Sequence, residues 1–382
     1  MMNMRSNKRD DLPEDLVVEI LSRVPVVSML RLRATTKTWN VLIKDGRVGK
    51  KHYDNNAPRR PRHSLIIMLI AFRVYLVRVN LNQDYNNKVK IISQFSLKDP
   101  VYNSLKEVDI RNIFHCDGLL LCATKYNRLV VWNPCSVETK WIKPSRFYKD
   151  SDIYALGKSS CNKYKVLRIN QDGFTSRSIL LECEIYDFIS NSWRIVGKTR
   201  SWSIREWKSC GISVNGNTYW LANSTKDDTR RDFLLGFDFS TERFTSVSLP
   251  VDHRMYYKLI ALSVTREDQK LCMLASWSNE TSISDVWIAT KIESSTGAAS
   301  WAKFLSIRLV DKPFCFTIRT NVLVDKENKV LVCRGKHGVS NYFLHVVGED
   351  NKCIQVDHHD PKSTCSLLVN YVPSLVQINQ SL

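Results

Sequence analysis

The sequence lacks the short motifs that mark the common catalytic folds. It has no glycine-rich phosphate loop of the Walker type, no GxSxG, no HExxH and no GxGxxG. The usual signatures of P-loop nucleotidases, α/β serine hydrolases, zinc peptidases and dinucleotide-binding enzymes are therefore missing. Glycine and proline are also scarce, at 13 and 11 of 382 residues, which is typical of a folded globular chain rather than a disordered one. We expect a protein that is not an enzyme and needs no cofactor or metal.

Paired cysteine motifs are absent as well. Eleven cysteines are scattered between Cys116 and Cys365, their number is odd, and no two form a CxxC pair. Several lie in apolar runs such as LLLCAT and VLVCRG, where a free thiol behaves as a small core residue. The N-terminal MMNMRSNKRDD also lacks the apolar core of a secretory leader. The pattern favours a reducing compartment, so we expect the cytoplasm, the nucleus or both.

Acidic residues are much fewer than basic ones. The chain has 56 Lys and Arg against 38 Asp and Glu, which gives a net charge of +18. Such an excess fits a basic surface that keeps the protein soluble, or an acidic partner that could be nucleic acid or protein. Because no RNA-binding signature, zinc-finger spacing or basic-zipper repeat accompanies the charge, nucleic acid is the weaker alternative.

No apolar run is long enough for a membrane span. The most apolar one, SLIIMLIAFRVYLVRV at residues 64–79, falls short of the roughly 20 residues needed and contains Arg73 and Arg78. The alternation of side chains after Arg73 predicts a strand instead. We therefore expect no association with a membrane.

The N-terminal part of the chain has a helical pattern that the rest does not share. By composition and periodicity the chain divides into a flexible tail, a helical module, a linker and a strand-rich region, at residues 1–11, 12–53, 54–63 and 64–382. Pro13 suits the first position of a helix that Pro25 ends, and two further short helices are expected in VSMLRLRAT and after Lys37. Three helices in about 40 residues bury too little surface to be stable alone, which predicts a partner that covers an apolar face.

From residue 64 onward, pairs of strands around polar turns recur. Most pairs place an aromatic residue at the start of the second strand, and these residues are Trp141, Trp193, Phe244 and Trp301, with Gln355 at the next position. Their separations of 52, 51 and 57 residues predict a radial β array with one blade per repeat. Two hairpins per repeat make a four-stranded sheet, and the region has room for about six blades. We predict a mainly β protein with a small N-terminal α module, in which these aromatic residues belong to the blade core.

Two parts of the chain resemble known families. LPEDLVVEILSRVPVVSMLRLRATTKTWNVLI looks like an F-box of the form common in plants, although Thr36 stands where that family usually has Cys. The matching residues are Leu12, Pro13, Leu16, Glu19, Ile20, Leu21, Val24, Pro25, Leu30, Arg31, Arg33, Lys37, Trp39 and Asn40. The rest resembles the F-box-associated domain, a kelch-like β-propeller, through GLLLC (118–122), VVWNPCS (130–136), IYDFISNSW (185–193), VNGNTYWLA (214–222) and LGFDFSTERF (235–244). This second resemblance becomes weak after residue 250.

The resemblance implies a substrate-recognition subunit of a Skp–cullin–F-box ubiquitin ligase. The F-box would bind a Skp-type adaptor and through it a cullin, and the propeller would bind an unknown target protein for ubiquitination. We expect the adaptor contact or its direct support to come from Leu12, Pro13, Leu16, Ile20, Val24, Leu30 and Trp39. The sequence does not separate residues that touch the adaptor from residues that pack helix against helix.

Three other functions remain open at this point. The first is a stand-alone interaction propeller with a non-functional F-box, and the others are a propeller enzyme and a basic nucleic-acid-binding protein. Two polar clusters bear on an enzyme or metal site. The segment DHHDPKS, from Asp357, is expected to be a surface loop because adjacent histidines on a strand point to opposite faces. The pair His115-Cys116 is expected to be structural rather than a nucleophile and its base.

Overall fold

The computed structural model describes most of the chain, including nearly all of the strand-rich region. The described residues are 12–24, 28–29, 32, 35–44, 48, 51, 63–80, 88–99, 107–143, 149, 151–170, 180–204, 211–225, 232–250, 257–265, 269–277, 280–308, 322–337, 341–350, 352–356, 365–374 and 376–378. The expected flexible tail 1–11 lies outside this set, as do residues 54–62 of the expected linker, and His63 is the first residue of a strand.

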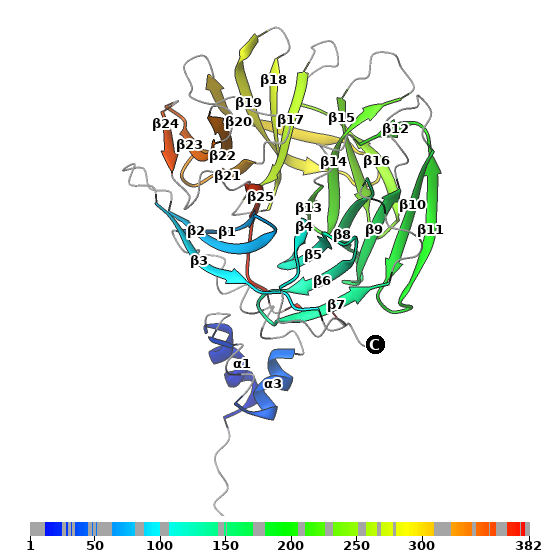
Figure 1. The fold of residues 1–382 in the computed structure, drawn as a ribbon, viewed down its shortest axis with the longest axis vertical. Helices are drawn as coiled ribbons and strands as arrows, with labels where there is room; N and C mark the ends of the chain where they lie inside the picture. Colours follow the sequence, from blue (N-terminus) through cyan, green and yellow to red (C-terminus); the bar gives the residue numbers. More distant parts are fainter. Residues whose placement is uncertain are drawn as a thin grey trace, which may run out of the picture.

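The described strands form six sheets that are arranged in a ring (Figure 1). We number these sheets blades 1 to 6 in chain order. Blade 1 contains β1 (His63–Ile70), β2 (Arg73–Asn80) and β3 (Lys88–Phe95), with β25 (Cys365–Asn370) as its innermost strand. Blade 2 contains β4 (Ile110–Cys116), β5 (Leu119–Thr124), β6 (Leu129–Asn133) and β7 (Glu138–Ile142). Blade 3 contains β8 (Ile153–Lys158), β9 (Tyr164–Asn170), β10 (Leu181–Asp187) and β11 (Ser192–Thr199).

The second half of the ring has the same plan. Blade 4 contains β12 (Trp202–Ser203), β13 (Ile212–Val214), β14 (Asn217–Ser224), β15 (Asp232–Asp238) and β16 (Arg243–Val247), and both short strands pair with β14. Blade 5 contains β17 (Tyr257–Val264), β18 (Leu271–Trp277), β19 (Glu280–Ile292) and β20 (Ala299–Arg308). Blade 6 contains β21 (Val322–Asp325), β22 (Val330–His337), β23 (Asn341–Gly348) and β24 (Cys353–Val356). The prediction of a mainly β propeller with about six blades is confirmed.

The helical module lies below the ring in Figure 1. The described part of the chain contains two of its helices, α1 (Glu14–Ser22) and α3 (Lys37–Lys44). Most of the helix that we expected in VSMLRLRAT falls outside the described residues. No helix in the described chain is long and apolar enough to cross a membrane. The apolar run at residues 64–79 instead forms most of the hairpin of β1 and β2.

The hydrophobic core of the ring is divided into six clusters, and each cluster fills the space between two neighbouring blades. For example, Trp132 of blade 2 is buried against blade 1, and Trp220 of blade 4 is buried against blade 3. The sixth cluster joins the two ends of the ring, because Leu344 of blade 6 packs with Ile66 of blade 1. Every described blade therefore shares its apolar surface with both neighbours, as sheet-to-sheet packing in a propeller requires.

The C-terminal strand closes the ring. β25 pairs with β1 in antiparallel register, with Asn370 opposite Ile66, so blade 1 combines the two ends of the propeller. The chain then continues across blade 2, where the Asn133 amide donates to the carbonyl oxygens of Ser374 and Val376 at 3.1 and 2.7 Å. Ile378 is buried in the cluster between blades 2 and 3. The C-terminal segment thus belongs to blade 1 and also packs against blade 2 and the contact between blades 2 and 3.

The repeated aromatic residues lie on the outermost strands of blades 2 to 5, partly buried and packed between blades. The Trp193 indole donates to the Lys143 carbonyl at 2.7 Å, and the Trp301 indole donates to the Ser248 carbonyl at the same distance. Both carbonyls follow the outermost strand of the preceding blade. The predicted core role of these residues is confirmed. Gln355 is exposed on β24.

One hairpin turn is formed by an Asn-Gly pair. Asn215 and Gly216 connect β13 to β14 with φ angles of 51° and 84°. Both angles are positive, as a type I′ turn requires, and Asn-Gly tolerates this conformation well. The turn is therefore a tight hairpin.

Candidate functional site

Helix α1 carries apolar side chains on two different faces. Its first turn contains Glu14 and Asp15, where negative charge stabilises the positive end of the helix dipole. On the inner face, Val18 and Leu21 are 6% and 2% exposed. They belong to the core cluster of the helical module, which also contains Met29, Leu42, Ile43 and Val48. This inner face holds α1 against α3.

The outer face of α1 is an exposed apolar stripe. Leu12, which lies just before the helix and its N-cap Pro13, is 58% exposed. Leu16 and Ile20 lie within the helix four residues apart and are 50% and 53% exposed. Side chains at this spacing lie one above the other along a helix. Three large aliphatic residues exposed so close together are unusual for a surface without a partner. We call Leu12, Leu16 and Ile20 the α1 stripe.

The seven predicted adaptor-contact residues fall into three groups. The first group is exposed and contains Leu12, Leu16, Ile20 and Pro13, of which Pro13 is the N-cap of α1. Val24 and Trp39 are partly buried and pack against the inner cluster, and Leu30 lies outside the described residues. The structure therefore brings four of the seven to the surface and turns two inward.

One exposed apolar residue of the module was missed. Val41 of α3 is 63% exposed, although its neighbours Leu42 and Ile43 are buried. Three consecutive apolar residues on a helix cannot all face one side. At most two of them can therefore pack against α1, and the sequence did not show which one points away.

Polar contacts fix the ends of both helices. The Glu19 carboxylate accepts from Arg23 in the same helix and forms an ion pair with Lys51, each at 2.6 Å. The hydrogen bond from Lys51, followed by that from Arg23, lowers the pKa of Glu19. At the start of α3 the Thr36 hydroxyl accepts from the Trp39 amide at 3.1 Å, which is the usual role of Thr at a helix N-terminus. Thr36, the departure from the F-box pattern, thus caps α3.

The helical module contacts the propeller at the turn between β6 and β7. Cys135 of this turn packs against the inner cluster of the module. Its thiol lies 3.3 Å from the Tyr371 hydroxyl, and its amide donates to the Asn133 side chain at 2.9 Å. The same Asn133 holds the C-terminal segment. One turn of blade 2 thus connects the module, the ring and the C-terminal segment.

Two polar clusters of the sequence bear on a metal site or a nucleophile. No group of three or more His, Cys, Asp or Glu side chains in the described chain could hold a metal ion, and Asp357 to Asp360 fall outside it. Burial lowers the pKa of His115 to about 4 and raises the pKa of Cys116 far above its ordinary value. A neutral thiol beside a weakly basic imidazole is a poor nucleophile. The His115 ring instead accepts a hydrogen bond from the Gly118 amide at 3.1 Å.

Comparisons with known proteins identify both parts of the chain. Residues 10–51 match the F-box domain, and residues 65–378 match the F-box associated beta propeller domain. The Arabidopsis thaliana F-box protein At4g10190 is 61% identical over 371 residues, which cover 96% of this chain and 98% of that protein. Two more F-box proteins of the same plant, At3g21120 and At3g21130, are 49% and 51% identical, with 97% of this chain covered in each case and 100% and 98% of those proteins.

Proposed function

Because this chain belongs to the F-box proteins that carry an F-box-associated β-propeller, we propose that it is the substrate-recognition subunit of a Skp–cullin–F-box ubiquitin ligase. The proposed division is a tail at residues 1–11, an F-box at 12–53, a linker at 54–63 and a target-binding propeller at 64–382. The F-box binds a Skp-type adaptor, and the adaptor binds a cullin. The propeller holds a target protein in the cytoplasm or the nucleus.

The observation that carries this proposal is the α1 stripe. Leu12, Leu16 and Ile20 are exposed while Val18 and Leu21 of the same helix fill the inner cluster. Fully burying a large aliphatic side chain contributes about 1.5 to 3 kcal/mol. These three are already about half buried, so covering the rest contributes roughly half of that for each one. The stripe fits the adaptor contact, and Val24 and Trp39 support it from within.

The protein itself performs no bond chemistry in this proposal. It raises the effective concentration of target lysines near the enzyme that carries ubiquitin, which is a proximity effect. The neutral, buried state of the His115-Cys116 pair supports a non-catalytic role.

The test is adaptor binding by the full chain. We expect Leu16→Asp plus Ile20→Asp to abolish co-purification with a Skp-type adaptor, because two carboxylates would be buried without partners. The control is Ile92→Asp plus Ile195→Asp, which places the same charges on exposed apolar residues of the outer strands β3 and β11. This control should bind normally.

Two outcomes would contradict the proposal. If the unmodified chain does not bind the adaptor and is stable without it, the stand-alone interaction propeller is favoured. If the α1 variant binds as well as the control, the α1 stripe is not the contact. Circular dichroism and thermal melting of both variants distinguish loss of contact from loss of fold.

A further inference from the structure

Two exposed aromatic side chains stand at the tips of neighbouring hairpins in blades 1 and 2. Phe72 lies in the turn between β1 and β2 and is 45% exposed, and Tyr126 lies in the turn between β5 and β6 and is 79% exposed. Exposed aromatic residues dominate the energetics of many protein interfaces. We call Phe72, Lys125 and Tyr126 the aromatic tip.

The aromatic tip is a fixed platform rather than two independent loops. The Lys125 ammonium lies 5.3 Å from the centre of the Phe72 ring, which joins the two hairpins. The segment between them is bound to both, because the Ile110 amide donates to the Phe72 carbonyl at 3.0 Å and the Lys125 amide donates to the Asp109 carbonyl at 2.9 Å. A platform held by backbone hydrogen bonds loses little entropy when a partner binds.

The turn that carries Phe72 is locally unfavourable. Ala71 and Phe72 have φ angles of 46° and 64°, and residues other than Gly, Asn and Asp pay a steric cost in this conformation. An Asn-Gly pair would form the same hairpin without this cost. Local rules broken at an exposed position are typical of functional surfaces.

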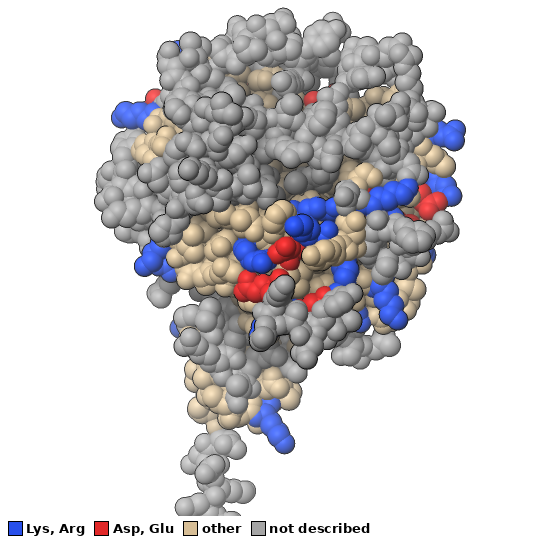
Figure 2. All heavy atoms as spheres, in the orientation of Figure 1, with Lys and Arg blue, Asp and Glu red and all other residues tan. Residues whose placement is uncertain are grey.

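The charges beside the aromatic tip are largely neutralised. Arg73 forms ion pairs with Asp109 at 2.6 Å and with Glu107 at 3.2 Å. Arg128 is paired with Asp99. Figure 2 shows acidic and basic side chains next to each other where β1 and β2 meet β4 and β5. Lys125, in contrast, has no ion-pair partner in the described chain. The platform thus presents two aromatic rings and one uncompensated positive charge.

The aromatic tip lies on the opposite side of blade 2 from the helical module. Strand β6 begins just after the turn of Lys125 and Tyr126 and ends at the turn of Cys135, which contacts the module. An adaptor bound to the α1 stripe therefore leaves the aromatic tip accessible.

We infer that the aromatic tip is a docking site for a target segment that presents an apolar side chain next to a carboxylate. This inference deepens the proposed function and rests on it, because it assigns the target contact of the same receptor. The apolar side chain packs between Phe72 and Tyr126. The carboxylate pairs with Lys125, whose charge agrees with the net charge of +18 for the chain.

The test selects random twelve-residue peptides from a display library on the immobilised full chain. We expect peptides with an Asp or Glu next to a large apolar residue to be enriched. Their binding should fall about tenfold or more in Phe72→Ala plus Tyr126→Ala, as for truncated interface hot spots. The variant Lys125→Glu should select basic residues instead, because the sign of the charge is reversed. The control Ile92→Ala plus Ile195→Ala should bind the same peptides normally.

Three results overturn this inference. They are a selection that enriches no peptide, selected peptides that bind the Phe72 and Tyr126 variant unchanged, and an acidic preference that survives Lys125→Glu. Adaptor binding is measured on the same samples. If the adaptor fails to bind while the peptides behave as expected, the ligase proposal fails and the docking site remains. If the reverse holds, only the docking site fails.

Discussion

Gly297 shows how much a single backbone position matters at the contact of two blades. It lies in the turn between β19 and β20 with a φ of 75°, and a Cβ there would be 2.1 Å from the Ser246 carbonyl oxygen of blade 4. We expect Gly297→Ala to destabilise the protein by about 2 kcal/mol or more, because backbone cannot move aside cheaply. Urea unfolding would measure this. Gly197→Ala is the matched control, because a Cβ at Gly197 meets no atom within 4 Å.

His115 makes stability depend on pH. Its folded pKa of about 4 lies below the ordinary value of 6.5, because burial penalises the charged ring. Well above pH 6.5 the ring is neutral in both states, so His115 does not change the free energy of unfolding with pH there. As the pH falls from 6.5 towards 4, the unfolded chain binds a proton that the folded chain does not, and stability decreases.

The corresponding experiment compares the protein with His115→Gln. We expect the unmodified protein to lose about 1 to 2 kcal/mol more than the variant between pH 8 and pH 5. Carboxylates titrate in both proteins, so their effect on stability cancels when the two pH-dependent losses are subtracted. Equal losses in the two proteins would show that His115 is not held neutral.

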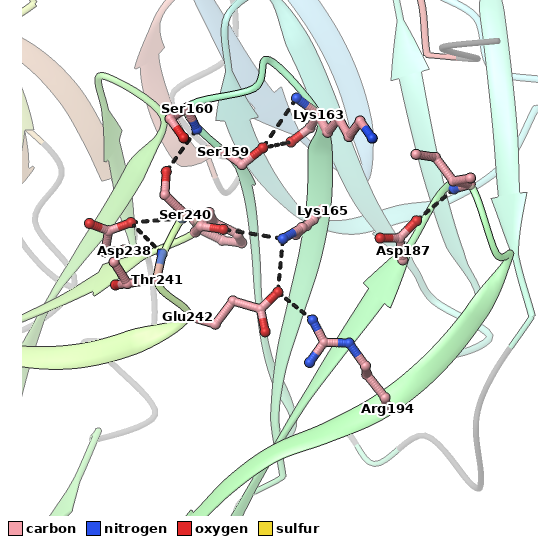
Figure 3. A network of polar contacts seen from close by, with 12 residues as sticks. Ser159, Ser160, Lys163, Lys165, Asp187, Arg194, Asp238, Ser240, Thr241 and Glu242 are labelled. Carbon is pink, nitrogen blue, oxygen red and sulfur yellow. Dashed lines mark hydrogen bonds and ion pairs between the residues drawn. The ribbon is translucent and has the colours of Figure 1, made fainter. Parts of the chain in front are cut away.

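At the scale of elements, one carboxylate ties blade 4 to blade 3. Figure 3 shows Glu242, from the turn between β15 and β16, between Lys165 of β9 and Arg194 of β11. Lys165 Nζ donates to Glu242 at 2.8 Å and to the Phe239 carbonyl at 3.3 Å. Nearby, the Ser160 amide donates to the Ser240 hydroxyl at 2.7 Å and connects the same two blades. Burial alone would raise the pKa of Glu242, but Arg194 and Lys165 outweigh it and lower the pKa.

We expect Glu242→Gln to destabilise the protein by about 1 to 2 kcal/mol at pH 7, because two charge-assisted hydrogen bonds weaken. The depressed pKa gives the sign of the pH effect. The stability difference between the unmodified protein and Glu242→Gln is complete above the ordinary pKa of 4.5 and decreases as the pH falls below it. Urea midpoints at pH 7 and pH 3.5 would measure both. Glu349→Gln breaks the exposed Lys329–Glu349 pair and should have no measurable effect.

The sequence predicted those elements that short local patterns mark, such as the outermost strands of the blades. The repeat of Trp141, Trp193, Phe244 and Trp301 marks the outermost strands of blades 2 to 5, because each blade needs a large side chain at the same place against its neighbour. The candidate site was predicted less well. In α1 apolar residues occupy both faces, so the pattern alone could not separate the inward Leu21 from the outward Leu16 and Ile20. That separation depends on where α3 packs.

At the scale of the whole molecule, the closure of the ring could not be read from the sequence. β1 pairs with β25 about 300 residues later, and neither strand carries the aromatic residue that marks blades 2 to 5. The aromatic tip could not be predicted for a similar reason, because Phe72 and Lys125 come together only when blade 2 packs on blade 1. Such non-local contacts are also late and costly in folding. The C-terminal segment is therefore the part on which the integrity of the ring depends most.

Removing that segment gives the sharpest test of closure. A chain that ends at residue 364 lacks β25, Tyr371 and Ile378, so β1 loses its inner neighbour and two clusters lose buried residues. We expect it to aggregate or to melt without a cooperative transition, because β1 exposes a long apolar edge. A synthetic peptide of residues 365–378, added during refolding, should pair with β1 and restore the transition. A chain that ends at residue 378 is the control and should melt like the full chain. Normal melting of the shorter chain without peptide would show that the ring does not depend on β25.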